Sequence, residues 1–530
     1  MNQALKDLIP SRGERLLPAV SAMLLLISFP PLHLLLPPFV ALVPFAVWLS
    51  DLPPGREGAR SAMRGGALLG GLYFGTLLYW ILVALVWYSK LAALAYVGTV
   101  IGLTLAGALF GWSLHRLLHG ARVPLWLALP VTWTAIEWLR AHMPGELAFP
   151  WLGLGTSLTG YPELVGIAEI VGARGVTFWL VLVNGLVAAL VISLRDTPTR
   201  AEHLRRVALL AVVVALPMGW GVWRARTLEL RTAATIAVVQ PNIPEEVKLG
   251  ENRGVDSTFS ALKTLMPLVP TEGVDLVATP EITFSAWIEL DVPMQARVSE
   301  ATAMLETPVV FGAIGHEYRD DGSLIRFNSA FMLDADGHLT DYRYDKHRLV
   351  PVVERTPLPF LLERLAFFGA YGRGTGWPLA ETANGARFGV LICYESSYQD
   401  VARGFRRAGA DILVNLTNDA WYGREVWYAR TLALWQHPAH LVMRAIENRV
   451  GIARSANTGI SLFVDPLGRI YEETPLFTAE VRTAPVLTSD VLSVYTRWGD
   501  VVGSAAAIST VLLLLLALRR GFERELASSG

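Results

Sequence analysis

The stretch FGVLICYE at residues 388–395 indicates how the C-terminal half of this 530-residue chain folds. Five residues typical of a buried strand lead directly into Cys393, and a helical stretch follows at 397–409. Similar runs alternate along the chain, with strand-like ones at 234–239, 274–278, 309–311 and 411–414 and helical ones at 254–268, 292–305 and 429–447. This alternation predicts an α/β layered domain of roughly 260 residues, which is large enough to bury its own core.

The rest of the chain has the composition of a membrane protein. The whole sequence is 53% hydrophobic and 17% charged, whereas about 25% of a soluble protein is charged. Apolar stretches near the roughly 20 residues needed to cross a bilayer lie at 15–32, 34–51, 65–88, 90–115, 124–140, 165–193, 205–223 and 500–518. We therefore predict an α-helical membrane bundle of about eight spans. Residues 1–229 would hold spans one to seven, 230–495 the α/β domain, and 496–530 the last span with a short tail.

The connections between these spans differ in basic residues. One set carries Lys6, Arg12, Arg15, Arg56, Arg60, Arg64, Arg116, Arg122, Arg195, Arg200, Arg205, Arg206, Arg519, Arg520 and Arg524. The other set, outside the large insert, carries only Lys90, Arg140, Arg174, Arg224, Arg226 and Arg497. Because short cytoplasmic loops are enriched in Lys and Arg, both termini are predicted to be cytoplasmic and the α/β domain to lie outside.

Charge and cysteine content exclude several functions. The formal net charge of −1 leaves no basic surplus to neutralise nucleic-acid phosphates, so no nucleic-acid partner is expected. Cys393 is the only cysteine, which excludes an intrachain disulfide and a multi-thiolate metal cluster. His437 and His440 are spaced like metal ligands, but no third ligand accompanies them. Cys393 is therefore either a small core residue or a nucleophile.

Three reactive residues each follow a strand-like run. Glu281 ends the run 275–281, Lys346 follows 342–345, and Cys393 follows 388–392. Strand ends converge on one rim in α/β enzymes. There a carboxylate can take the proton of a thiol, and a lysine can stabilise the oxyanion that forms when the thiolate attacks a carbonyl. Taken singly, the three could instead be a core cysteine, a helix-cap neighbour and one member of a solvated charge run.

Several motifs occur together with these residues. They are PE at 280–281, KHRLVP at 346–351, ICYE at 392–395, NDAWYG at 418–423, RSANTG at 454–459 and FPWLG at 149–153. In this combination the chain resembles the nitrilase superfamily and, within it, the apolipoprotein N-acyltransferases. The resemblance covers nearly the whole chain and implies an αββα nitrilase-like sandwich.

The resemblance also implies a reaction and its partners. Cys393 would take the sn-1 acyl chain of a phospholipid, typically phosphatidylethanolamine, as a thioester. The α-amine of the diacylglyceryl cysteine of an apolipoprotein would then accept that chain. No cofactor or metal is implied, a monomer is expected, and the location would be a bacterial inner membrane with the catalytic domain on the periplasmic side.

Further site residues follow from the same resemblance. Glu354 would orient Lys346 or hold its charge, Tyr394 would present a backbone N–H to the oxyanion, and Glu395 would brace the site from behind. The alternative for Glu354 and Glu395 is that they are ordinary surface carboxylates.

The chain departs from the family pattern at Thr279, Val352, Val353 and Leu249, where family members commonly carry other residues. The catalytic trio is intact, so these departures bear on donor preference, rate and acceptor identity. Two alternatives remain open. One is a membrane-tethered nitrilase-type amidase that uses water as acceptor, and the other is a catalytically impaired membrane-bound scaffold.

Overall fold

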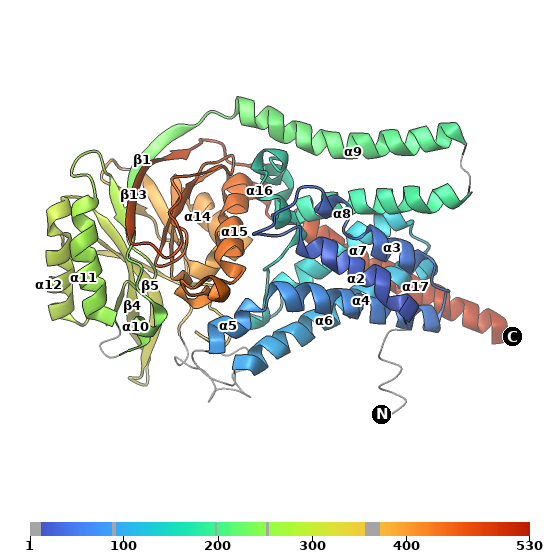
Figure 1. Ribbon diagram of the computed structural model, residues 1–530, viewed down its shortest axis with the longest axis horizontal. Helices are drawn as coiled ribbons and strands as arrows, with labels where there is room; N and C mark the ends of the chain where they lie inside the picture. The colour runs from blue at the N-terminus through green and yellow to red at the C-terminus, as the bar shows by residue number, and fades with distance from the viewer. Residues whose placement is uncertain (1–11, 87–91, 197–198, 251–253, 356–370, 530) are drawn as a thin grey trace.

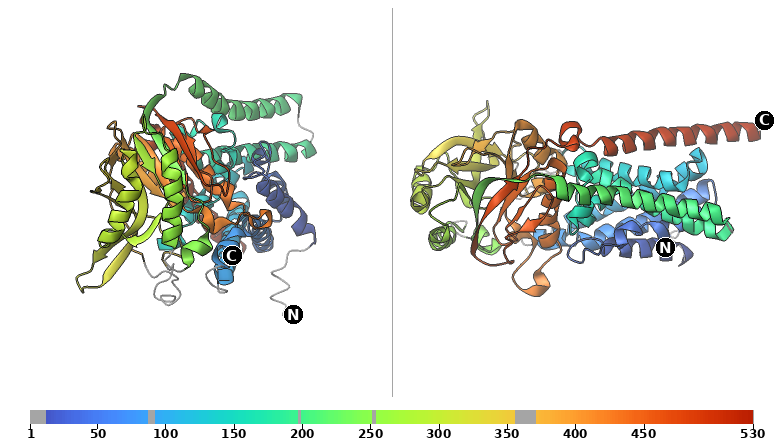
Figure 2. Two further views of the ribbon diagram at one scale, coloured as in Figure 1. Left: turned by 60° about the vertical axis from the view of Figure 1, so that its left-hand side comes forward. Right: turned by 90° about the horizontal axis from the view of Figure 1, so that it is seen from above.

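The computed structural model describes residues 12–529 except 87–91, 197–198, 251–253 and 356–370. Figure 1 shows a bundle of long, roughly parallel helices joined at one end to an α/β domain. The right-hand view in Figure 2, seen from above, shows the same arrangement, with α17 extending away from the α/β domain along the bundle.

The bundle is built from the helices α2 (Arg12–Leu26), α3 (Val43–Ser50), α4 (Arg56–Leu77), α5 (Trp80–Val86), α6 (Ala92–Arg116), α7 (Leu125–Ala141), α8 (Ala168–Ser193), α9 (Arg200–Thr227) and α17 (Val501–Ser529). Small residues let α4 and α6 approach closely, as is common between membrane helices. A Cβ atom placed on Gly66 would lie 2.2 Å from the carbonyl oxygen of Gly107. The two backbones are therefore in direct contact.

Four of the described helices are long and apolar enough to cross a membrane, at Ala93–Ala121, Ala168–Ser193, Arg200–Thr227 and Val501–Arg520. The other predicted spans are helical but shorter or more polar. The stretches 15–32 and 34–51 give α2 of 15 residues and α3 of 8, because the prolines at 30, 31, 37 and 38 break the chain between them. The stretch 65–88 divides at Leu77 into α4 and α5. Among the described residues, four of the eight predicted spans thus form helices of full spanning length. Apolar composition alone does not show where a helix ends.

The helix ends farthest from the α/β domain are held together by polar contacts. Arg195 pairs with Asp51 at 2.7 Å, and His115 Nε2 lies 3.0 Å from the carbonyl oxygen of Pro53. Arg520 also donates to the carbonyl oxygen of Ala121 at 2.7 Å. The ends of α3, α6 and α8 and the part of α17 around Arg520 therefore lie at one end of the bundle, beyond which α17 continues (Figure 1).

The α/β domain contains two sheets. The first has the strand order β13-β1-β2-β4-β5-β6, with β3 paired to β4, and the second has the order β12-β11-β10-β9-β8-β7. The first sheet uses β1 (Arg231–Gln240), β2 (Leu276–Ala278), β3 (Phe284–Trp287), β4 (Val309–Tyr318), β5 (Leu324–Leu333), β6 (Leu339–Asp345) and β13 (Glu480–Thr488). The second uses β7 (Ala380–Glu381), β8 (Arg387–Ile392), β9 (Ile412–Thr417), β10 (Gly451–Ala456), β11 (Leu462–Val464) and β12 (Ile470–Tyr471).

Helices cover the outer faces of both sheets. Figure 1 shows α11 (Val255–Leu265) and α12 (Val292–Thr302) at the edge of the molecule, and α14 (Gln399–Ala408) and α15 (Ala433–Asn448) between the second sheet and the bundle. The strands β8, β9 and β10 run parallel and are fully buried apart from Arg387. The predicted α/β layered domain is confirmed.

The bundle and the α/β domain are joined by a buried interface. Arg449, at the end of α15, donates to Glu169 of α8 at 2.8 Å, and Arg224 of α9 lies 3.0 Å from the same carboxylate. Trp151, in the loop after α7, donates to Gln436 of α15 at 2.9 Å. One cluster of buried apolar side chains runs through both parts. The two parts therefore share a core.

Candidate active site

Cys393 lies directly after β8, at the start of the short 3₁₀ helix η11 (Cys393–Ser397). Its φ is 50°, which is the left-handed region that residues other than glycine rarely adopt. Backbone strain of this kind persists where the surroundings enforce it, and it is frequent at reactive residues. Glu281 follows β2 and Lys346 follows β6, so all three residues of the predicted trio come from strand ends.

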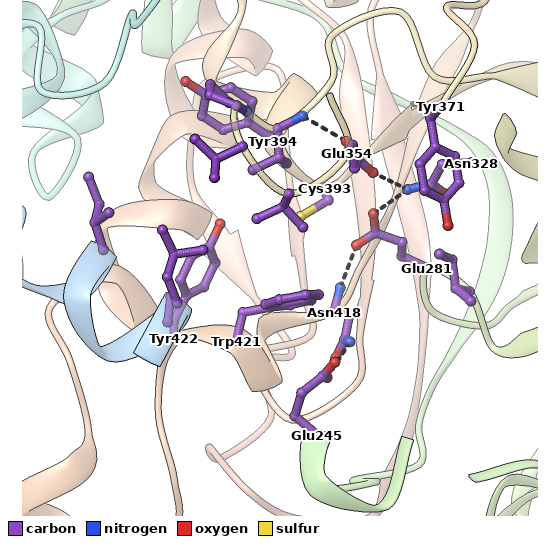
Figure 3. A pocket seen from close by; sticks show the side chains of 18 of the residues that line it. Glu245, Glu281, Asn328, Glu354, Tyr371, Cys393, Tyr394, Asn418, Trp421 and Tyr422 are labelled. Atoms are coloured by element: carbon purple, nitrogen blue, oxygen red, sulfur yellow. Dashed lines mark hydrogen bonds between the residues drawn. The ribbon is translucent and has the colours of Figure 1, made fainter. Parts of the chain in front are cut away.

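The structure brings this trio together with two asparagines. Lys346 Nζ lies 3.1 Å from Glu281 Oε1 and 3.0 Å from Glu354 Oε1. Asn328 Nδ2 donates to the same two oxygens at 2.8 and 2.7 Å. The other oxygen of Glu281 accepts the backbone N–H of Asn418 at 3.1 Å. Figure 3 shows Glu281, Asn328, Glu354 and Asn418 near Cys393.

Burial and charge set the protonation states of the trio. Burial would raise the pKa of Glu281, but the Lys346 ammonium and the Asn328 amide hold that pKa below its ordinary value. Burial would lower the pKa of Lys346, but Glu281 and Glu354 raise that pKa well above its ordinary value. Burial, assisted by the charge of Glu281, raises the pKa of the Cys393 thiol. The site therefore holds a carboxylate, an ammonium and a neutral thiol, and the thiol must pass its proton to a base as it reacts.

Glu395 connects the segments that carry Lys346 and Cys393. Its Oε2 accepts the backbone N–H of Ile392 at 2.8 Å, and its Oε1 accepts those of His347 at 2.7 Å and Arg348 at 3.1 Å. Glu395 is fully buried, and Glu354 is 7% exposed. Neither is therefore a surface carboxylate.

His437 was not expected at the site. Its Nε2–H donates to the carbonyl oxygen of Cys393 at 3.1 Å, and its Nδ1 lies 2.8 Å from Asp419 Oδ1. Arg454 donates to the other oxygen of Asp419 at 2.6 Å. Both ring nitrogens of His437 are thus engaged within the protein, which leaves neither to bind a metal together with His440.

Cys393 opens into a cavity of about 380 Å³ between the α/β domain and the bundle. The bundle wall is mainly apolar and is formed by Trp80, Ile81, Ala84, Leu85, Ala95 and Thr99. The domain wall carries the charged and polar residues Glu245, Lys248, Glu281, Arg326, Asn328, Glu354, Tyr371 and Asn418. The cavity therefore has an apolar side and a polar side, and Cys393 is among its lining residues.

The departures from the family pattern occupy different places in this cavity. Leu249, Val352 and Val353 line it. Thr279 lies behind the lining and receives a hydrogen bond from Thr283 at 3.0 Å. Changes at the first three positions can therefore affect a bound substrate directly.

Among the described residues, one group lies close enough together to hold a metal ion, namely Asp334, Asp336 and His338. These residues form the turn between β5 and β6, and Asp334 Oδ1 already accepts the backbone N–H groups of the other two at 3.0 and 2.8 Å. None of the three lines the cavity.

The α/β sandwich and the Cys–Glu–Lys cluster define the carbon–nitrogen hydrolase class, whose family model matches residues 235–495. Residues 21–186 match the N-terminal domain of apolipoprotein N-acyltransferases. The chain is 30% identical over 523 residues to the apolipoprotein N-acyltransferase of Geobacter metallireducens, covering 97% of each chain. It therefore belongs to the apolipoprotein N-acyltransferase family, and the resemblance seen in the sequence is confirmed.

A second relative carries the same family name. The apolipoprotein N-acyltransferase of Chlorobaculum tepidum is 32% identical over 74% of this chain and 77% of its own. Among solved structures, an amidase from Nesterenkonia sp. aligns with 51% of this chain and 95% of its own, at 17% identity and a TM-score of 0.35.

Proposed function

We propose that this protein transfers an acyl chain from a membrane phospholipid to the α-amine of the diacylglyceryl cysteine of an apolipoprotein, through a thioester on Cys393. Family membership over 97% of the chain supports this activity. The observation that carries it is the cavity, because the same space is lined by Cys393 and by the apolar wall of the bundle. An acyl chain can lie along that wall while its ester carbonyl reaches the thiol.

In the first step, Cys393 Sγ attacks the ester carbonyl carbon as Glu281 takes the thiol proton. The charge that develops on the carbonyl oxygen is stabilised by Lys346 Nζ and the backbone N–H of Tyr394, since fixed donors in a buried site stabilise an oxyanion strongly. When the intermediate collapses, the carbon–oxygen bond to glycerol breaks and Glu281 returns the proton to the departing alkoxide. The products are a thioester and a lysophospholipid.

In the second step, the neutral amine attacks the thioester carbonyl carbon. Glu281 accepts a proton from the amine, the carbon–sulfur bond breaks, and the proton passes to the departing Cys393 thiolate. Glu354 keeps Lys346 charged and in place during both steps, while Glu395 fixes the segments that carry Lys346 and Cys393. The apolar bundle wall limits access of water to the thioester.

We further propose phosphatidylethanolamine as the donor, a monomeric protein, and an inner-membrane location with the α/β domain in the periplasm and both termini in the cytoplasm. The proposed division is a bundle at 1–229, a catalytic domain at 230–495 and a final span at 496–530. Eight crossings would result if α2, α3, α4 and α7 join the four longer helices. The basic residues Arg195 and Arg520 at the far end of the bundle support this orientation.

A direct test is to incubate the purified protein with phosphatidylethanolamine and record its intact mass. We expect one added acyl chain, located on Cys393 and released by neutral hydroxylamine, and no adduct on the Cys393→Ala variant. The thioester should persist until a diacylglyceryl lipopeptide is added. The absence of an adduct on the wild-type protein would refute the proposal, and rapid release of free fatty acid without an acceptor would indicate a hydrolase.

A further inference from the structure

Arg326 is a cation on the polar wall of the cavity that the proposed reaction does not use. It lies on β5, two residues before Asn328, whose amide contacts both Glu281 and Glu354. Because side chains alternate along a strand, Arg326 shares the active-site face with Asn328. The opposite face is marked by Phe327, whose ring lies 5.1 Å from the guanidinium carbon of Arg343.

The position of Arg326 relative to the reactive groups follows from strand geometry. A rise of about 3.4 Å per residue places its Cα about 7 Å along the strand from that of Asn328. Its guanidinium carbon lies 5.5 Å from the ring centroid of Tyr371, which also lines the cavity. The side chain is thus packed against an aromatic ring on the cavity wall.

The other cations near the trio are already engaged. Lys346 lies between Glu281 and Glu354, and Lys248 donates to the carbonyl oxygen of Ile282 at 3.1 Å. In the parts of the chain that the structure describes, no carboxylate lies within 4.0 Å of the Arg326 guanidinium. A partly buried guanidinium that lines the cavity and pairs with no described carboxylate is available to bind an external anion.

We propose that Arg326 binds the phosphodiester group of the glycerophospholipid donor, an inference that rests on the proposed function. About six covalent bonds separate the sn-1 carbonyl carbon from phosphorus, an extended reach of about 7 Å. This reach is close to the offset of about 7 Å along β5 between Arg326 and Asn328. Asn328 marks the reacting end, because its amide contacts the proposed base Glu281. With the carbonyl at Cys393 and the acyl chain on the bundle wall, the phosphate lies on the domain side. A guanidinium can bind it through two parallel hydrogen bonds.

The test compares donors with and without a phosphate for the wild-type protein and the variants Arg326→Gln and Arg326→Lys. The donors are phosphatidylethanolamine and phosphatidylglycerol in mixed micelles, and p-nitrophenyl palmitate as a neutral ester. For Arg326→Gln we expect KM to rise about tenfold or more for both phospholipids, because the phosphate loses one charged hydrogen-bonding partner. The kcat values and the KM for the neutral ester should stay unchanged, and Arg326→Lys should be intermediate.

Arg319→Gln is the matched control, because Arg319 is exposed at the end of the β4–β5 hairpin and does not line the cavity. An unchanged KM for both phospholipids in Arg326→Gln, or an equal rise for the neutral ester, would overturn the proposal. Inhibition of neutral-ester turnover by soluble glycerophosphoethanolamine, but not by glycerol, tests the same site without a variant, and its absence would also overturn the proposal. A wild-type protein that forms no thioester with any donor would instead refute the proposed function.

Discussion

Buried side chains hold the backbone around Cys393 at two peptide groups, Leu391–Ile392 and Cys393–Tyr394. Glu395 accepts the N–H of Ile392, and His437 donates to the carbonyl oxygen of Cys393. The peptide that carries this carbonyl also carries the N–H of Tyr394, the proposed oxyanion donor. A hydrogen bond to the carbonyl polarises the same peptide and strengthens its N–H as a donor. We therefore expect His437 to act as a positioning residue, through the backbone of the proposed nucleophile Cys393.

We predict that His437→Phe slows thioester formation by about 10- to 100-fold. This is the effect expected when one or two hydrogen bonds to charged or reacting groups are lost. The KM for the phospholipid should change little, because His437 does not line the cavity. His437→Gln should recover part of the rate, since its side-chain amide can donate to the same carbonyl. Single-turnover acylation followed by intact mass measures the rate.

The two variants separate positioning from general structural damage. Their melting temperatures are measured in the same detergent. His437→Phe keeps an aromatic ring but has no hydrogen-bond donor, whereas His437→Gln has a donor but no ring. A wild-type acylation rate in His437→Phe, or equal losses in both variants, would contradict a role through the hydrogen bond.

The pH dependence of Glu354→Gln follows from the charge balance around Lys346. Glu281 and Glu354 raise the pKa of Lys346 well above its ordinary value. Removing the charge of Glu354 therefore lowers the pKa of Lys346. Lys346 acts as a cation, and the rate therefore falls as pH rises through its pKa. We expect the fall in acylation rate at high pH to begin at a lower pH in Glu354→Gln than in the wild-type protein.

The measurement is single-turnover acylation between about pH 8 and about pH 11.5, a range that includes the ordinary lysine pKa of about 10.4. Glu354→Asp is the matched control, because it keeps the charge and should keep the wild-type profile more closely. If the high-pH limb of Glu354→Gln coincides with that of the wild-type protein, Glu354 does not hold the charge of Lys346.

The site residues differ in how far the sequence predicts them. Glu281, Lys346 and Cys393 each follow a strand within a recognisable local motif, so spacing and chain order indicate them. Asn328 contacts Glu281, which is 47 positions away, and His437 contacts Cys393, which is 44 positions away. Local patterns of polarity carry no information about such contacts. His437 also lies in a helix whose spacing with His440 suggests metal ligands instead.

At the scale of elements, the contact between α4 and α6 depends on glycine. A Cβ atom on Gly107 would lie 2.5 Å from the carbonyl oxygen of Gly66 and 3.0 Å from the Cα of Gly70. We predict that Gly107→Ala destabilises the bundle by about 1–3 kcal/mol, the typical cost of overpacking, and lowers the melting temperature. Thermal unfolding in detergent measures the effect.

Gly102→Ala in the same helix is the control, because a Cβ atom there meets nothing within 4 Å. Alanine has the higher helix propensity, so this variant should be as stable as the wild-type protein or slightly more so. Equal melting temperatures for the two variants would show that close contact between α4 and α6 is not required.

Periodicity and composition predict most elements but not all of their boundaries. The parallel strands β8, β9 and β10 are buried on both faces, which gives continuous apolar runs that are easy to identify. The bundle is harder, because an apolar stretch can contain a break. The helix α4 begins at Arg56 in polar sequence, and α5 separates from it after Leu77 within an unbroken apolar run. Tertiary contacts set that break, since α5 turns to form one wall of the cavity.

At the scale of the whole molecule, the reactive thiol lies where the α/β domain meets the bundle. The shared core and the Glu169–Arg449 pair fix the two parts against each other. Both proposed substrates are anchored in the membrane by acyl chains. A cavity with one apolar wall from the bundle lets these chains stay in an apolar environment while their polar ends reach Cys393.

This arrangement makes a prediction about membrane orientation that uses the single cysteine of the chain. In a Cys393→Ala background no thiol remains, so one new cysteine reports one position. Ser323 is exposed in the α/β domain, and Glu57 is exposed at the opposite end of the bundle, near the start of α4. In intact spheroplasts, a membrane-impermeant maleimide should label Ser323→Cys and leave Glu57→Cys unlabelled.

After lysis both variants should react, which shows that Glu57→Cys is accessible once the membrane is open. The physical reason is that basic residues concentrate at the Glu57 end, and Lys and Arg near short loops hold that end in the cytoplasm. Labelling of Glu57→Cys alone in intact spheroplasts would invert the orientation. It would place the catalytic cavity on the cytoplasmic side, where a periplasmic lipoprotein could not reach Cys393.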